Sequence, residues 1–190
     1  MKKISIFIFI LFLFSCGLGP INRRGFNVYE KPITNSKSIR IKTNGVYVSI
    51  SNKDGKRGFY LYKNGLYHSE YFGDNFWNSP QKALSKRKPY YNLSKNFGQF
   101  QIYDDTINIQ NFYSNNNEFF RKQLIHYRGL ILNDSTIKIL SWFGNDNVEI
   151  LTEPMIYRFY KSSDKPDSTK AWFLNKKWYQ KNVHESRKKL

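Results

Sequence analysis

The chain has 190 residues, of which 31 are Lys or Arg and 14 are Asp or Glu, so its formal charge at pH 7 is +17. This length allows one domain of about 150 residues with a proper hydrophobic core. The charge favours anionic partners over cationic ones, and the aromatic content of 18% favours strands and therefore β structure.

The N-terminus has the layout of an export signal. Lys2 and Lys3 form a cationic start, and residues 4–14 are apolar except for Ser5. A membrane-spanning helix needs about 20 consecutive apolar residues, and this run is too short for that. The sequence therefore predicts a signal peptide, residues 1–15, rather than a transmembrane anchor.

The single cysteine, Cys16, follows the apolar run in the motif "LFSC". This boundary resembles the signal of bacterial lipoproteins, in which a small residue precedes a cysteine that is diacylated and becomes the new N-terminus. The resemblance implies lipid attachment at Cys16 and a lipid-anchored tether over residues 16–36. Because Asp does not follow Cys16, it also implies the outer membrane of a Gram-negative bacterium. An ordinary secretory signal and a buried free cysteine are the alternatives.

Acylation and export would limit both the chemistry and the partners of the mature chain. No thiol would remain for a disulfide, a nucleophile or a metal site. Without Lys2 and Lys3 the chain has 29 basic and 14 acidic residues, a charge of +15. Export removes nucleic acid and leaves anionic lipid or lipopolysaccharide as candidates. Two basic clusters are the expected contacts, unless they serve only solubility: Lys86, Arg87, Lys88, Arg187, Lys188 and Lys189.

Residues 37–180 are predicted to form one β domain. Residues 46–50 alternate between apolar and polar faces, the pattern of a half-buried strand. Asn64-Gly65 joins two further alternating runs, which predicts a hairpin with a type I′ turn because both residues tolerate positive φ. Later strands are expected at residues 97–103, 106–113, 119–132 with a bulge at Gly129, 136–143, 148–151 and 155–160.

Two helices are expected beside the strands. The stretch "SPQKALSKRK", residues 79–88, predicts a short inserted helix with Ser79 as its N-cap and Pro80 at its first position. A C-terminal helix is predicted at residues 171–179, capped by Ser168 or Thr169 and docked on the sheet through Trp172, Phe173 and Trp178. The basic residues 181–190 are expected to form a frayed tail.

About ten short antiparallel strands in chain order predict a mainly β fold, an antiparallel meander or an up-and-down barrel, with one inserted short helix and a C-terminal helix. The motifs "FGQFQIYDDTINIQ" and "GLILNDSTIKIL" are similar to paired strands in lipocalin-like domains of small envelope lipoproteins. This resemblance covers about residues 37–160 and implies a lipocalin-like barrel.

No catalytic, metal or cofactor site is predicted. His68, His126 and His184 lack the spacing of metal ligands, and Asp104-Asp105 fits a hairpin turn, where Asp accepts backbone hydrogen bonds. Nucleophile-elbow, phosphate-loop and zinc-protease motifs are missing. Two non-enzymatic functions remain: a barrel that binds a small amphipathic or anionic ligand, and an interaction lipoprotein with a filled interior whose basic aromatic surface contacts envelope components.

Overall fold

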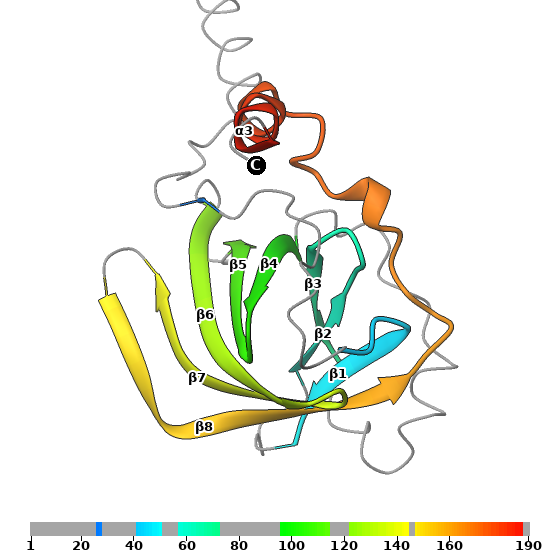
Figure 1. Cartoon of the computed structure of the whole chain (residues 1–190), viewed down its shortest axis with the longest axis vertical. Helices are drawn as coiled ribbons and strands as arrows, with labels where there is room; N and C mark the ends of the chain where they lie inside the picture. Colours follow the sequence, from blue (N-terminus) through cyan, green and yellow to red (C-terminus); the bar gives the residue numbers. More distant parts are fainter. Residues whose placement is uncertain are drawn as a thin grey trace, which may run out of the picture.

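The computed structural model describes residues 26–27, 41–50, 57–72, 96–114, 122–144 and 147–187. Eight antiparallel strands of this part form one closed barrel, in which each strand pairs with the next and β8 pairs with β1 (Figure 1). The predicted up-and-down barrel is therefore confirmed. The strands are β1 (Gly45–Ser49), β2 (Arg57–Leu61), β3 (Leu66–Tyr71), β4 (Phe97–Tyr103), β5 (Thr106–Ser114), β6 (Lys122–Asn133), β7 (Thr136–Gly144) and β8 (Asn147–Lys161).

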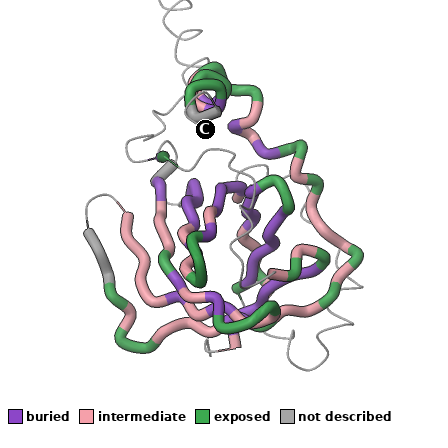
Figure 2. Tube along the Cα trace, in the orientation of Figure 1, coloured by how far each residue is buried: buried purple, intermediate pink, exposed green. Residues whose placement is uncertain are grey.

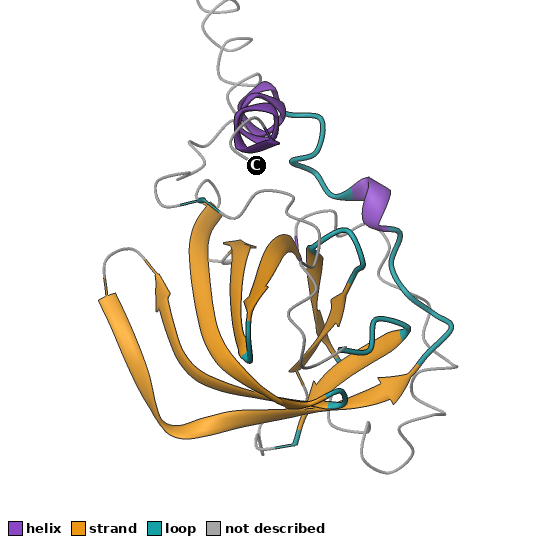
Figure 3. Ribbon diagram, viewed as in Figure 1, coloured by secondary structure: helices purple, strands orange, loops and turns teal. Residues whose placement is uncertain are grey.

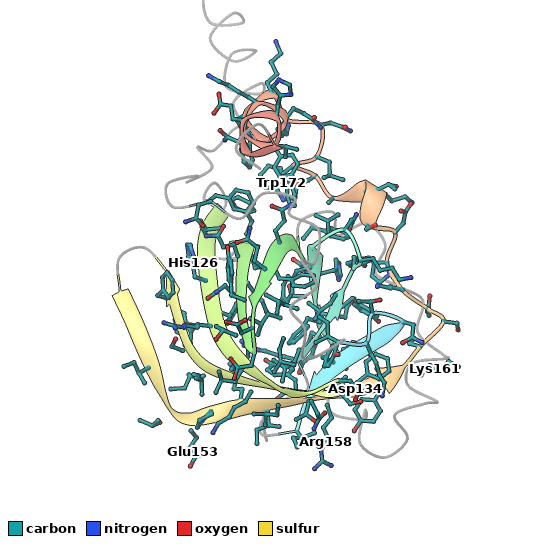
Figure 4. The ribbon with its side chains drawn as sticks, in the orientation of Figure 1. His126, Asp134, Glu153, Arg158, Lys161 and Trp172 are labelled. Carbon is teal, nitrogen blue, oxygen red and sulfur yellow. The ribbon has the colours of Figure 1, made fainter. Side chains whose placement is uncertain are left out.

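The last strand, β8, is one element of 15 residues where the sequence predicted two short strands. Ile139 of β7 pairs with Met155, and Ser141 pairs with Ile150, so the ladder is irregular between these pairs. Pro154 lies in this interval, and proline cannot donate a ladder hydrogen bond. Glu153 lies at the bend that results (Figure 4). The prediction of about ten strands is wrong, since the described residues contain eight.

The hairpin predicted at Asn64-Gly65 joins β2 to β3, but its turn is not type I′. Gly65 has a φ of 80°, whereas Asn64 does not have a positive φ. The N–H of Gly65 donates to the carbonyl of Tyr62 at 3.0 Å. This loop fits a type I turn followed by one left-handed residue, the usual form of a three-residue hairpin loop. Only the glycine therefore requires left-handed backbone.

Replacing Gly65 with Val is expected to lower the free energy of unfolding by about 1–3 kcal/mol, because a β-branched residue is strained at positive φ. Gly65→Asn is the matched control. Because Asn tolerates the left-handed region, this variant should lose clearly less free energy of unfolding than Gly65→Val. Urea unfolding followed by far-UV circular dichroism measures both. Equal losses for the two variants would contradict the left-handed assignment.

Two more predicted backbone features are confirmed. Asp104-Asp105 forms the turn between β4 and β5, with Asp104 at a φ of 52°. The register of β6 against β7 shifts between Arg128 and Gly129, where the bulge was expected. In an up-and-down barrel the β2–β3, β4–β5 and β6–β7 connections lie at one end, which we name the turn end. The other connections lie at the opposite end.

Two groups of buried side chains use opposite faces of the strands. The lumen cluster draws residues from all eight strands, so it lies inside the barrel. It includes the predicted common face of β4 and β5, which consists of the cross-strand pairs Phe100–Ile109 and Ile102–Ile107. The outer cluster combines residues of β1 to β6 with Phe26 and the C-terminal segment.

The C-terminal segment contains a short 3-10 helix, η3 (Ser168–Lys170), and the helix α3 (Lys177–Arg187) (Figure 3). The predicted helix thus begins at Lys177 instead of residue 171 and continues to Arg187, into the expected tail. Asp167 caps η3 by accepting a hydrogen bond from the Thr169 N–H at 3.0 Å. Ser168 and Thr169, the predicted caps of the C-terminal helix, lie inside η3 and not at the start of α3. The expected docking is confirmed, because Trp172, Phe173 and Trp178 all pack in the outer cluster.

Strand β1 is buried on both faces, which differs from the half-buried strand that its alternation predicts. Tyr47 belongs to the lumen cluster, while Val46 and Val48 belong to the outer cluster, and all three are 0% exposed. Buried residues accordingly follow one another along β1, β2 and β4 (Figure 2). The second buried face arises because the C-terminal segment completes a core outside the barrel.

Lys165 fastens this segment to the turn end. Its Nζ donates to the carbonyls of Thr43 and Leu61, both at 2.7 Å, and lies 3.8 Å from the centre of the Tyr62 ring. The Tyr62 hydroxyl donates to the carbonyl of Pro166 at 2.7 Å. Burial lowers the pKa of Lys165 to about 8, and Lys63 adds to this effect. The chain leaving β8 is therefore held before it crosses to the outer wall.

Candidate functional site

The turn end of the lumen is closed by the residues that precede β1. Ile41 packs against the lumen cluster, and the Lys42 N–H lies 3.1 Å from both the Tyr47 hydroxyl and the Asp134 carbonyl. The Tyr47 hydroxyl donates to the same carbonyl at 3.0 Å. Lys42 Nζ also pairs with Asp134 Oδ2 at 3.0 Å, near the crossing of β1 and β8 (Figure 4). These bonds tie the start of the barrel to its β6–β7 turn.

A cavity of about 430 Å³ lies in the lumen on the other side of this closure. Its apolar wall consists of Phe59, Ile109, Ile139 and Met155. Small-molecule sites typically have volumes of about 300–1,000 Å³, with mostly apolar walls and a few placed polar groups. The cavity therefore has the size and the lining of a site for one small ligand.

Four tyrosines and one arginine line the cavity with polar groups: Tyr67, Tyr71, Tyr127, Tyr157 and Arg57. Burial raises the pKa of Tyr67 and of Tyr157, the nearby Tyr127 raises both further, and the charge of Arg57 partly opposes the rise. Arg57 therefore lies close enough to act on both hydroxyls. At neutral pH the Tyr67 and Tyr157 hydroxyls keep their protons. The Tyr157 hydroxyl donates to Met155 Sδ at 3.8 Å and the Tyr67 hydroxyl is hydrogen-bonded to Ser69, so each must exchange its present partner to donate to a ligand.

The side chains of Asn111 and Ser69 form a second polar part of the cavity wall. Asn111 Nδ2 donates to Ser69 Oγ at 3.3 Å, although β4 runs between their strands. The intervening residue, Gly98, carries no side chain and lies so close to β5 that an added Cβ would collide with the carbonyl oxygen of Gln110. Asn111 is 3% exposed, and within the described residues its Oδ1 has no hydrogen-bond partner. A buried acceptor of this kind is costly unless something donates to it.

The outer wall carries a separate polar group around Gln110. Gln110 accepts a hydrogen bond from the Asn27 N–H at 3.0 Å and donates to Asn27 Oδ1 at 2.7 Å. Its Nε2 also lies 3.0 Å from His126 Nδ1, and His126 stacks on Phe143 with ring centres 4.4 Å apart. These contacts attach the N-terminal segment to β5 and β6.

Acid is expected to weaken this attachment. Burial lowers the pKa of His126, so the folded state resists its protonation. In acid the unfolded chain therefore binds more protons than the folded chain. The contribution of His126 to the free energy of unfolding is fully present above about pH 6.5, the ordinary histidine pKa, and is lost as the pH falls through the lower pKa of the folded state. Unfolding measured from pH 7.5 to 5 should show a smaller acid loss in His126→Gln than in the natural chain. The exposed His184→Gln is the control, and equal pH profiles for natural chain and His126→Gln would contradict this role.

The histidines do not come together as metal ligands. His68 is 3% exposed and packs edge-on against Phe97 at 4.5 Å, while His126 contacts Gln110 and Phe143. Among the residues that the structure describes, no group of three or more His, Cys, Asp or Glu side chains is arranged to hold a metal ion.

The other residues singled out from the sequence fall mostly outside the described ranges. Cys16, the inserted helix at residues 79–88 with its basic cluster Lys86, Arg87 and Lys88, and the terminal Lys188 and Lys189 all lie there. Arg187 is the last residue of α3. Within the described part, no helix is both long and apolar enough to cross a membrane.

Sequence reasoning missed the polar lumen residues, although one signal was available. Asn111 follows Ile107 and Ile109 at the same two-residue period, which places a polar side chain in phase with a buried apolar face. A polar residue at a core-facing position is a site hypothesis in its own right. Arg57 gave no comparable signal, because it lies in a stretch rich in Lys, Asp and Gly.

Comparison of the chain with protein-family models, with curated proteins and with solved structures finds no match.

Proposed function

We propose that this protein is a lipid-anchored envelope protein whose barrel binds a small amphipathic or anionic ligand in its lumen and catalyses no reaction. The observation that carries the proposal is the cavity of about 430 Å³, which combines an apolar wall with Arg57 and buried polar groups. A barrel of eight strands has an interior of the size that holds one small ligand.

The export signal and the motif at Cys16 support the location in the outer membrane. Several acyl chains on one residue hold a protein firmly at a bilayer, and the charge of +15 on the mature chain favours anionic lipid or lipopolysaccharide beside it. The clusters Lys86–Lys88 and Arg187–Lys189 are the proposed contacts with that surface. Nucleic acid is not a proposed partner, because export separates the protein from it.

The competing proposal is an interaction lipoprotein without a ligand cavity. It requires side chains to fill the whole lumen. In the half of the barrel next to the turn end they do so, and the residues that fill it are Leu61, Ile102, Ile107, Ile131 and Ile137. The cavity beside Arg57 favours the binding module instead.

Native mass spectrometry and a fluorescent probe test the proposal. Residues 16–190 carrying Cys16→Ser are used, so that no acyl chain competes for the lumen. A retained small molecule is expected in the native spectrum, and 8-anilinonaphthalene-1-sulfonate, an amphipathic anion, should bind with enhanced fluorescence.

Met155→Trp places a large ring in the cavity and should abolish probe binding. Ile150→Trp is the matched control, because Ile150 is 78% exposed and should leave binding unchanged. Circular dichroism checks that both variants fold. A bare chain in the native spectrum, with equal probe fluorescence in all three proteins, would overturn lumen binding.

A further inference from the structure

The polar groups of the cavity specify the ligand more closely than its size does. Arg57 begins β2 and shares a face with Phe59 and Leu61, two members of the lumen cluster. No described carboxylate forms an ion pair with it. Glu70 also borders the cavity, but its charge raises the pKa of Tyr62, a residue of the outer cluster. Arg57 is exposed where it borders the cavity, and among the described residues its positive charge there has no fixed counterion.

Arg57 calls for an anionic group on the ligand, whereas Asn111 calls for a hydrogen-bond donor. Its amide nitrogen is already bonded to Ser69 Oγ, and Ser69 Oγ in turn lies 3.5 Å from the carbonyl of Asn96. The free Oδ1 can only accept a hydrogen bond. A ligand that displaces solvent from this atom must therefore present an O–H or N–H to it, or leave it unsatisfied.

These two requirements lie close together. Phe59 pairs with Ser69 and Arg57 pairs with Tyr71, so Arg57 and Ser69 are diagonal neighbours on adjacent strands. Diagonal neighbours have Cα atoms about 7–8 Å apart, a distance that an arginine side chain spans. Both groups are near the end of the barrel opposite the turn end, while Ile139, Ile109 and Met155 line the apolar wall.

We infer that the lumen recognises an amphipathic anion that carries a hydroxyl or N–H donor a few bonds from its anionic group, with the anion at Arg57 and the donor at Asn111 Oδ1. This inference rests on the proposed function and names the ligand class of the same site. The apolar part of the ligand lies against Phe59 and the aliphatic wall. The rings of Tyr67 and Tyr157 flank Phe59 at 5.4 and 4.8 Å. Tyr157 can donate to the anion in place of its weak contact with Met155 Sδ.

Matched probes separate the two contacts. Affinities of 3-hydroxydecanoate, decanoate and the methyl ester of 3-hydroxydecanoate are measured by calorimetry on residues 16–190 with Cys16→Ser. We expect the hydroxy acid to bind about tenfold more tightly than decanoate, because decanoate leaves the Asn111 acceptor unsatisfied. The ester should bind at least about tenfold more weakly than the acid, because it has no charge for Arg57. N-Octanoylglycine carries an N–H in place of the hydroxyl beside its carboxylate. Its affinity, compared with that of 3-hydroxydecanoate, shows which of the two donors the lumen prefers.

Two variants assign these preferences to their residues. Asn111→Leu has a similar shape without polar atoms and should remove the preference for the hydroxy acid while decanoate still binds. Arg57→Gln keeps hydrogen-bond donors without the charge and should remove the preference for the acid over the ester. Circular dichroism of each variant confirms the fold.

Three outcomes decide the matter. Equal affinities for decanoate and the hydroxy acid in the natural lumen, or a preference that survives in Asn111→Leu, would overturn the ligand class, while the proposed function stands as long as the sulfonate probe still binds. If none of the probes, including the sulfonate, binds, the proposed function and this inference both fail.

Discussion

Replacing Phe173 with Ala is expected to lower the free energy of unfolding by about 3–5 kcal/mol, the usual cost of removing a fully buried phenyl ring. Phe173 is 0% exposed. Its ring centre lies 5.0 Å from that of Tyr179 and 6.1 Å from those of both Phe26 and Phe112. The ring thus joins the C-terminal segment, the N-terminal segment and the barrel wall, and few substitutions should cost more.

Guanidinium chloride unfolding of the natural chain and the variant measures this difference. Tyr103→Ala is the control, because Tyr103 is 52% exposed on the β4–β5 hairpin and its loss should stay within about 0.5 kcal/mol. A loss below about 1 kcal/mol for Phe173→Ala would mean that the segment does not pack on the wall, since even partly buried rings cost more.

Cys16→Ser is expected to abolish acylation and signal cleavage, so that the unprocessed precursor accumulates in place of the acylated chain. Serine has no thiol to acylate, and without acylation the lipoprotein-type signal is not processed at this boundary. A single acyl chain gives an association constant of only about 10⁴ M⁻¹, whereas several chains anchor firmly. Residues 16–190 carrying Cys16→Ser have neither acyl chains nor the apolar run, so they should be found almost completely in the aqueous fraction. Basic contacts alone should leave a small bound fraction that salt removes.

Fractionation at low and high salt, with mass analysis of the N-terminus, measures this change. Ser15→Ala is the matched control, because it keeps a small residue before the cysteine and should be acylated and retained. An unmodified thiol at Cys16 in the natural protein from the membrane fraction would contradict the assignment of Cys16 as the anchor.

The strands were predictable where local chemistry alone determines them. Residues 97–103 and 106–110 alternate between apolar and polar side chains, which predicts two strands, and Asp104-Asp105 predicts the turn that joins them. The apolar residues of the two strands then pair on one face of the hairpin. Gly129 likewise marked its bulge. Residues 147–161 were harder, because Pro154 is a local signal to end a strand, and only pairing with β7 on both sides of the bend continues it.

The C-terminal helix shows a second limit. Trp172 and Phe173 were expected inside the helix, yet both precede it. Their burial depends on Phe26, Phe112 and Leu124, which are distant in sequence, and tertiary packing of that kind outweighs helix propensity. The same packing buries Val46 and Val48. The alternation of residue types along β1 shows that its two faces differ. It does not show which face lies inside the barrel when the lumen cluster covers one face and the outer cluster covers the other.

The lumen site could be predicted least. Arg57, Ser69 and Asn111 lie on β2, β3 and β5, and their approach depends on barrel closure and on the missing side chain at Gly98. Register across several strands determines such a site, and a single sequence carries little information about register. The charge indicated an anionic partner and the expected barrel a small amphipathic or anionic ligand, both in general terms only.

The docking of Phe26 and Asn27 also determines how a mechanical load would travel through the molecule. Among the described residues, a pull from the N-terminal side first meets the Phe26 ring, whose centre lies 5.1 Å from that of Phe112, and the two hydrogen bonds between Asn27 and Gln110. The load reaches β1 only after these contacts separate, since β1 begins at Gly45. Tension from the N-terminal side would therefore detach the contacts of Phe26 and Asn27 before it loads the β1–β8 seam that closes the barrel.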